Sequence, residues 1–134
     1  MNFYDNAMEV HLAAESLHEN GHNRMSIFNS CLAIELFLKS KISLVEGWER
    51  FEFSHDVVNM YRHLTKRFPS KTDLTKEITL GRKYFNESRY PYDDTAIYTK
   101  EFAQEFLEYV AAVKDYIDNQ CIASIDDLQD KFQK

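Results

Sequence analysis

The feature that most constrains the fold is an apolar stretch in the first half of the chain, from Met25 to Val45. Its middle, Cys31 to Leu38, is apolar at every position except Glu35. A continuous stripe at spacings of three and four residues is formed by Ile27, Cys31, Ile34, Leu38, Ile42 and Val45. A helix that is apolar on nearly all sides is buried inside a domain. We therefore expect a core helix here, with the rest of the chain packed around it.

Two charged residues, Glu35 and Lys39, interrupt this apolar surface. They are four positions apart with the acid first, which is the favourable order for an ion pair along a helix. A charged pair on a buried helix either closes a helix interface or marks a ligand site, and the sequence leaves both interpretations open. Because the stretch also contains several Ser and Asn, it is too polar for a membrane span, and we expect no membrane association.

The composition favours a small helical domain. The chain has 134 residues, 44% of them hydrophobic, with three Gly and two Pro. This length can bury a substantial core, so we expect one domain over residues 1–134. So few Gly and Pro indicate few turns and long elements, and no stretch alternates for long with the period of two that is typical of a strand.

Apolar periodicity and capping residues predict where the first helices lie. The first is expected over about Phe3–Asn20, and the second continues until just before Gly47. An irregular aromatic loop, WERFEF, follows. The third helix is expected over His55–Phe68, with Ser54 as its N-cap.

Capping residues predict three later helix starts. A fourth helix is expected from the capping-box pair Ser70 and Asp73, a fifth from Thr99, and a short terminal one from Ser124 and Asp127. The fourth is expected to end before the SRYPYDD segment, which holds a Pro. The sequence therefore predicts an all-α fold, a four- to five-helix up-and-down bundle with short loops.

The two cysteines and the first residues bear on localisation and cofactors. Cys31 lies in the expected core helix and Cys121 near the end, so we interpret both as free thiols in a reducing compartment. The opening MNFYDNAMEV lacks the basic and apolar regions of a signal peptide, so we expect a cytoplasmic protein. The five His are scattered and no Cys/His group has zinc spacing, so we expect no metal and no cofactor.

Charge is distributed unevenly along the chain. The net charge is −6, which argues against a general nucleic-acid coat protein. From Lys39 to Arg89, however, there are eleven Lys or Arg and seven Asp or Glu, against five and fifteen in the remainder. The basic middle is either a set of solvated helix faces or a site for an anionic ligand.

Four segments occur in the order found in a known helical family. HLAAESL belongs to the first expected helix, CLAIELFLKSKISLVEG to the second, SHDVVNMYRHL begins the third, and SRYPYDD follows the fourth. The positions that carry the match are Glu35, Leu38, Lys39, His55, Asp56, Arg89, Tyr90 and Pro91. From about Asn6 to Gln120 the chain thus resembles the HEPN (higher eukaryotes and prokaryotes nucleotide-binding) family.

The resemblance implies a fold similar to the C-terminal helical domain of aminoglycoside nucleotidyltransferases, commonly as a homodimer. Many HEPN proteins are encoded beside small nucleotidyltransferases as toxin–antitoxin pairs. Many others are metal-independent ribonucleases, whose signature is an Arg and a His a few residues apart, usually with a polar residue after the Arg. The implied partners are a second copy of the chain, a nucleotidyltransferase, and a nucleotide or RNA.

Arg50 and His55 are the candidate catalytic pair, because no His follows Arg89 in YPYDDTAIY. An imidazole near neutral pKa can move the proton of a 2′-hydroxyl or a leaving group, while a guanidinium holds the scissile phosphate. Against this, Phe51 replaces the usual polar neighbour, and the pair precedes the third helix, whereas the ribonuclease motif normally lies later. The structural alternative is that His55, beside Asp56, satisfies backbone groups at a helix start.

The candidate nucleotide-binding residues are Glu35, Lys39, Asp56, Arg89 and Tyr90. Each has a structural alternative, such as an interface ion pair for the first two and support of an irregular turn for Arg89. Three functions remain. The preferred one is a non-catalytic module, one half of a toxin–antitoxin pair, that binds a nucleotide, RNA or a nucleotidyltransferase. The others are a metal-independent endoribonuclease toxin and a structural protein whose fifth helix forms a dimer face.

Overall fold

The computed structural model describes residues 2–90 and 97–122, and within these residues all regular structure is helical. The elements are α1 (Phe3–Glu19), α2 (Asn23–Ile42), the 3₁₀ helix η1 (Trp48–Phe51), α3 (Val57–Arg67), α4 (Thr75–Glu87) and α5 (Lys100–Asn119). The predicted all-α bundle is confirmed. No helix in this described part is long and apolar enough to cross a membrane. The terminal helix predicted from Ser124 and Asp127 lies outside the described residues.

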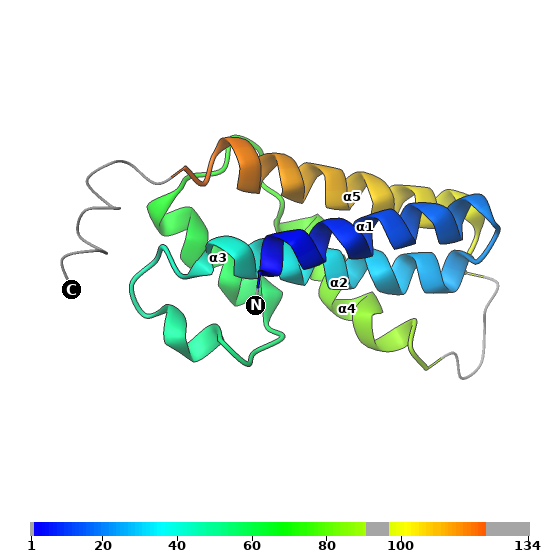
Figure 1. The fold of residues 1–134 in the computed structure, drawn as a ribbon, viewed down its shortest axis with the longest axis horizontal. Coiled ribbons are helices and arrows are strands. Elements are labelled where there is room, and N and C mark those ends of the chain that lie inside the picture. Colours follow the sequence, from blue (N-terminus) through cyan, green and yellow to red (C-terminus); the bar gives the residue numbers. More distant parts are fainter. Residues whose placement is uncertain (1, 91–96, 123–134) are drawn as a thin grey trace.

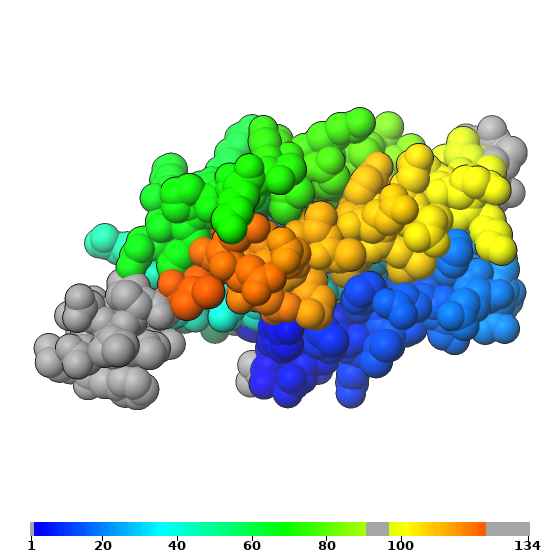
Figure 2. All heavy atoms as spheres, turned by 90° about the horizontal axis from the view of Figure 1, so that it is seen from above, coloured from blue at the N-terminus to red at the C-terminus, as the bar shows by residue number. Residues whose placement is uncertain are grey.

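α1 and α2 form an antiparallel hairpin, and α5 runs antiparallel to α1 (Figure 1). Gly21 makes the turn of the hairpin with φ of 80°, a left-handed conformation that glycine adopts without steric cost. Seen from above, α5 lies between α1 on one side and the green α3 and α4 on the other (Figure 2). Three long helices therefore form the body of the bundle, and the shorter α3 and α4 cover its remaining side.

α2 is the central element, in contact with α1, α3, α4, α5 and η1. The predicted stripe from Ile27 to Val45 is buried throughout, with each of its six side chains 9% exposed or less. The helix itself ends at Ile42 and not just before Gly47. The N–H groups of Leu44 and Val45 bond three residues back, so the chain continues as tight turns toward η1.

α4 approaches α2 closely at Gly81. A Cβ atom added there would lie 3.2 Å from Cδ1 of Ile34, which is fully buried. A methyl group at this position would require the Ile34 side chain to shift by a few tenths of an ångström. The close approach holds the second half of α4 next to the middle of α2, where Glu35 and Lys39 lie.

The start of α3 differs from the prediction by two residues. Asp56 and not Ser54 is its N-cap, since Oδ1 of Asp56 accepts a hydrogen bond of 3.2 Å from the backbone N–H of Asn59. The hydroxyl oxygen of Ser54 instead accepts from the N–H of Asp56, at 3.0 Å. Both side chains can cap a helix, and the later one does so here. As a result His55 stands in the loop before the helix.

The prediction that Ser70 and Asp73 form a capping box is wrong, because α4 begins at Thr75. Asp73 accepts hydrogen bonds from the hydroxyl and the N–H of Thr75, and these bonds lower the pKa of the Asp73 carboxyl. The Ser70 hydroxyl donates to a carbonyl within the same loop. The cap predicted at Thr99 is confirmed, since its hydroxyl oxygen accepts from the N–H of Phe102 at 3.0 Å.

Candidate functional site

A cavity of about 390 Å³ lies where the loop before α3 meets the second half of α4. Most of its lining side chains are charged or polar, so we call it the polar pocket. Its lining residues are Ser54, His55 and Asp56 from the loop, and Arg82, Phe85, Asn86 and Arg89 from α4 and the residues that follow it.

α4 and the residues just after it supply two guanidinium groups to the polar pocket. Arg82 and Phe85 are three positions apart on one side of α4, and Arg89 follows two residues after the helix ends at Glu87. Arg82 pairs with Asp56 at 3.4 Å between Nη1 and Oδ1. The guanidinium of Arg89 lies over the Phe85 ring, 5.3 Å from its centroid, and donates to the hydroxyl of Tyr90. The pocket is therefore basic, with one carboxylate at its rim.

Glu35 holds His55, the third basic group of the polar pocket, in place. Its Oε1 lies 2.8 Å from Nδ1 of His55, and its Oε2 lies 3.5 Å from Nζ of Lys39. Glu35 and Lys39 are only 5% and 8% exposed, whereas the His55 side chain is 68% exposed. The imidazole also stacks on Phe85, with 5.8 Å between ring centroids. Because the ring is fixed through Nδ1, the nitrogen that remains for a ligand is Nε2.

The predicted binding residues converge at this place. His55, Asp56 and Arg89 line the polar pocket, Tyr90 contacts Arg89, and Glu35 joins His55 to Lys39. These residues come from three separate segments of the sequence. The structure shows that these residues are neighbours. That they bind a nucleotide stays a prediction.

Arg50, the other predicted catalytic residue, is engaged elsewhere. Its Nη2 lies 3.1 Å from Nδ1 of His63, and its guanidinium packs over the ring of Phe51. The other ring nitrogen of His63 lies 2.7 Å from the carbonyl oxygen of Glu46, which ties η1 to α3. The structure thus gives Arg50 and His55 different partners within one chain. Their role as a catalytic pair stays a prediction.

Sequence reasoning did not single out Arg82 or Asn86. The signal was present, because positions 82, 85, 86 and 89 follow the spacing of one helix face and two of them are Arg. The pairing of His55 with Glu35, twenty positions apart, had no sequence signal.

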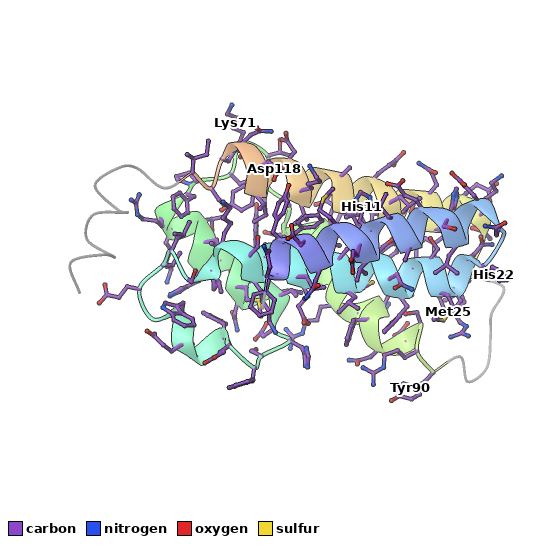
Figure 3. The ribbon with its side chains drawn as sticks, viewed as in Figure 1. His11, His22, Met25, Lys71, Tyr90 and Asp118 are labelled. Carbon is purple, nitrogen blue, oxygen red and sulfur yellow. The ribbon has the colours of Figure 1, made fainter. Side chains whose placement is uncertain are left out.

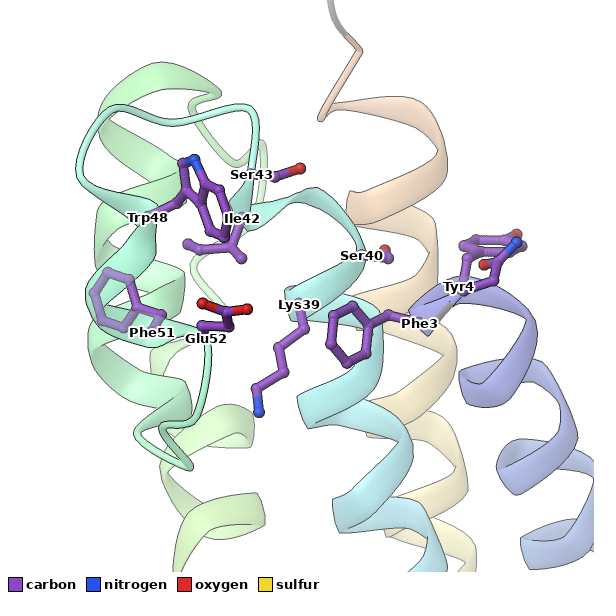
Figure 4. A pocket seen from close by; sticks show the side chains of 10 residues that line it. Phe3, Tyr4, Lys39, Ser40, Ile42, Ser43, Trp48, Phe51 and Glu52 are labelled. Carbon is purple, nitrogen blue, oxygen red and sulfur yellow. The ribbon is translucent and has the colours of Figure 1, made fainter.

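Lys39 also lines a larger groove, of about 670 Å³, between the start of α1, the end of α2 and η1 (Figure 4). Four of its residues are aromatic, so we call it the aromatic groove. The lining residues are Asn2, Phe3, Tyr4, Lys39, Ser40, Ile42, Ser43, Trp48, Phe51 and Glu52. At its edge the Tyr4 hydroxyl donates to Asp118, and this hydrogen bond, with burial adding to it, raises the pKa of Tyr4.

The other histidines do not gather at the polar pocket. Figure 3 shows His11 on α1 and His22 at the turn of the α1–α2 hairpin, and neither lines the polar pocket. Across residues 2–90 and 97–122, no three His, Cys, Asp or Glu side chains are grouped so as to hold a metal ion. In this part of the chain, the polar groups that line the pocket are two guanidinium groups, an imidazole, an amide, a hydroxyl and the Asp56 carboxylate.

Fold and site together define a helical bundle with a basic polar pocket between α4 and the loop before α3. The model of the HEPN domain family matches residues 2–120 of the chain. The match covers most of the sequence, and the protein belongs to the HEPN family. No curated protein and no solved structure matches the chain significantly.

Proposed function

We propose that this HEPN domain is a binding module that holds a phosphate group of a nucleotide or of RNA in the polar pocket. The observation that carries the proposal is the convergence of Arg82, Arg89 and His55 on one cavity. Family membership supports a function related to nucleotides or RNA in broad terms. The phosphate is the part of such ligands that a basic pocket of this size recognises.

The chemistry of the pocket suits a phosphate. Guanidinium groups present several N–H donors in a fork that matches phosphate oxygens, and such charge-assisted hydrogen bonds are stronger than neutral ones. Arg82 is 57% exposed and its contact with Asp56 is 3.4 Å long, so this ion pair is weak and a phosphate can compete for the guanidinium. Arg89 lies over the rings of Phe85 and Tyr90, and stacking of this kind holds a guanidinium in place within the pocket.

Removal of both guanidiniums tests the proposal. With Arg82→Gln and Arg89→Gln combined, we expect nucleotide or RNA affinity to fall about 100-fold, since each charge-assisted contact contributes about 1.5 kcal/mol or more. The measurement is a calorimetric titration, supported by the ligand-induced rise in melting temperature. Arg62→Gln with Lys66→Gln, on the exposed side of α3, is the matched control because it removes the same charge. If both double variants lost the same affinity, the loss would be explained by net charge alone, and this result would contradict a phosphate site in the pocket.

A catalytic function is the second candidate, favoured by the contact between His55 and Glu35. A carboxylate bound to Nδ1 holds an imidazole in one orientation, as general acid–base catalysis requires, and two guanidiniums lie in the same pocket. We expect such an enzyme to cleave a structured RNA in excess chelator, with the cleavage lost in His55→Ala. Arg50→Gln distinguishes the sequence-based pair from the pocket residues: loss of cleavage would support the pair, and retention would assign the phosphate contact to Arg82 and Arg89. If the wild-type protein left the RNA uncleaved, this result would exclude the catalytic function under those conditions.

The proposal includes a homodimer and a nucleotidyltransferase partner within a toxin–antitoxin pair. Its support is family membership together with apolar side chains that remain at the surface, among them Met25 at 38% and Ile97 at 43% exposure. The mass in light scattering distinguishes a dimer from a monomer, and co-purification with the product of an adjacent nucleotidyltransferase gene, where one exists, identifies the partner.

A further inference from the structure

We infer that the aromatic groove is a second subsite, which takes the base of the nucleotide whose phosphate occupies the polar pocket. The inference rests on the proposed function and adds to it a requirement for an aromatic ring in the ligand. It also names the residues that recognise this ring, Phe3 and Trp48 as the walls and Lys39 between them.

The walls of the groove are built for a flat ring. Phe3, the first residue of α1, and Trp48, the first residue of η1, lie on opposite sides, with the Lys39 side chain between them in Figure 4. Aromatic side chains bind bases of any sequence by stacking, because every base has a π-face. The ammonium group of Lys39 lies 5.9 Å from the centroid of the Phe3 ring. It is a donor within reach of carbonyl or ring-nitrogen acceptors at the edge of a base.

One carboxylate links the groove to the polar pocket without lining either cavity. Glu35 contacts Lys39 of the groove through one oxygen and His55 of the pocket through the other. The loop that leaves η1 makes the same connection, since Glu52 lines the groove and Ser54 lines the pocket. The two cavities are therefore neighbours. In a nucleotide a single sugar separates phosphate and base, and the inference requires that one such ligand reach both cavities.

Charge decides which end of the ligand enters which cavity. The groove contains one cation and one anion, Lys39 and Glu52, and Lys39 is already paired with Glu35. The polar pocket contains two guanidiniums and one carboxylate, with His55 in addition. A phosphate is thus attracted to the pocket and repelled by Glu52, while an uncharged ring avoids the cost of burying charge in the groove. The volume of about 670 Å³ is within the usual range for small-molecule sites.

Trp48 gives a direct test, because it is the single tryptophan of the chain. We titrate the protein with AMP, ribose 5-phosphate and inorganic phosphate, and follow Trp48 fluorescence alongside calorimetry. AMP is expected to quench Trp48 and to bind about 5- to 150-fold more tightly than ribose 5-phosphate, the usual contribution of base stacking. Ribose 5-phosphate is expected to bind without quenching.

Two matched variants separate the groove from the pocket. Phe3→Leu removes one wall and is expected to abolish the preference for AMP while leaving the affinity for ribose 5-phosphate unchanged. Phe53→Leu makes the same change at an aromatic side chain that is 89% exposed and lines neither cavity, so it should keep the preference. If AMP and ribose 5-phosphate bind equally and neither quenches Trp48, the inference is overturned while the proposed function stands. If neither compound binds, the inference is also overturned, and RNA binding by the Arg82 and Arg89 variants then decides the proposed function separately.

Discussion

Replacement of Glu35 by alanine is expected to lower the free energy of unfolding by about 3 to 5 kcal/mol, which is the usual cost of breaking a buried ion pair from one side. Glu35 is 5% and Lys39 8% exposed, and the Glu35 carboxylate forms an ion pair with the Lys39 ammonium. Without this carboxylate, Lys39 stays charged and buried without its ion-pair partner, or the chain must open to hydrate it. Urea denaturation followed by circular dichroism measures the change.

Two controls decide whether the lost stability comes from the Lys39 ammonium that has no ion-pair partner in the variant. His55→Ala removes the other partner of Glu35, but the His55 side chain is 68% exposed, so we expect a change within about 1 kcal/mol. Glu35→Leu combined with Lys39→Met replaces the pair with apolar groups and is expected to recover most of the stability, as such replacements often do. A Glu35→Ala protein within about 1 kcal/mol of the wild type would mean that Lys39 is hydrated in the folded state.

If both expectations hold, packing alone does not account for an ion pair at these positions. Glu35 lies between Lys39, which lines the aromatic groove, and His55, which lines the polar pocket, and contacts both. An apolar pair at these positions would keep the helix buried but release the His55 ring. Stability and function can therefore be tested separately. The variant with Glu35→Leu and Lys39→Met should fold, and its affinity for the ligand measures what the carboxylate contributes to binding.

The fold was predictable because its main signal is local. Apolar spacing within α2 fixes which side chains face inward, and this holds for every residue of the stripe from Ile27 to Val45. Caps were less predictable, because Ser54 and Asp56 are both competent acceptors and only packing selects between them. The Ser70 and Asp73 spacing failed for the same reason, since short polar side chains close loops as readily as they begin helices.

The site was predictable only in part, because it depends on contacts between elements. Charge and resemblance indicated Glu35, His55 and Arg89, but nothing in a linear pattern says that an acid of α2 contacts a histidine before α3. The Arg50–His55 spacing is local, yet Arg50 turns toward His63, which the turn at Gly47 brings close. Periodicity gives the face of each helix, and the packing of helices decides which faces meet.

Replacement of Phe37 by alanine is expected to destabilise the protein by about 3 to 5 kcal/mol, through lost burial and the cavity that remains. Phe37 is fully buried in α2 and belongs to the larger of the two apolar clusters. Its ring contacts Tyr4 edge-on at 5.6 Å and His11 at 6.5 Å, so it fastens α1 onto α2. Thermal and urea unfolding measure the loss.

The matched control is Leu12→Ala, also a large-to-small change, at a side chain of α1 that is 61% exposed. We expect it to stay within about 0.5 kcal/mol of the wild type, as surface substitutions usually do. Phe37→Leu should fall between the two, because it keeps part of the buried area and leaves a smaller cavity. If Phe37→Ala and Leu12→Ala had equal effects, α1 would not be packed on α2 through this ring. The aromatic groove, which takes Phe3 and Tyr4 from the same helix, would then lack a fixed wall.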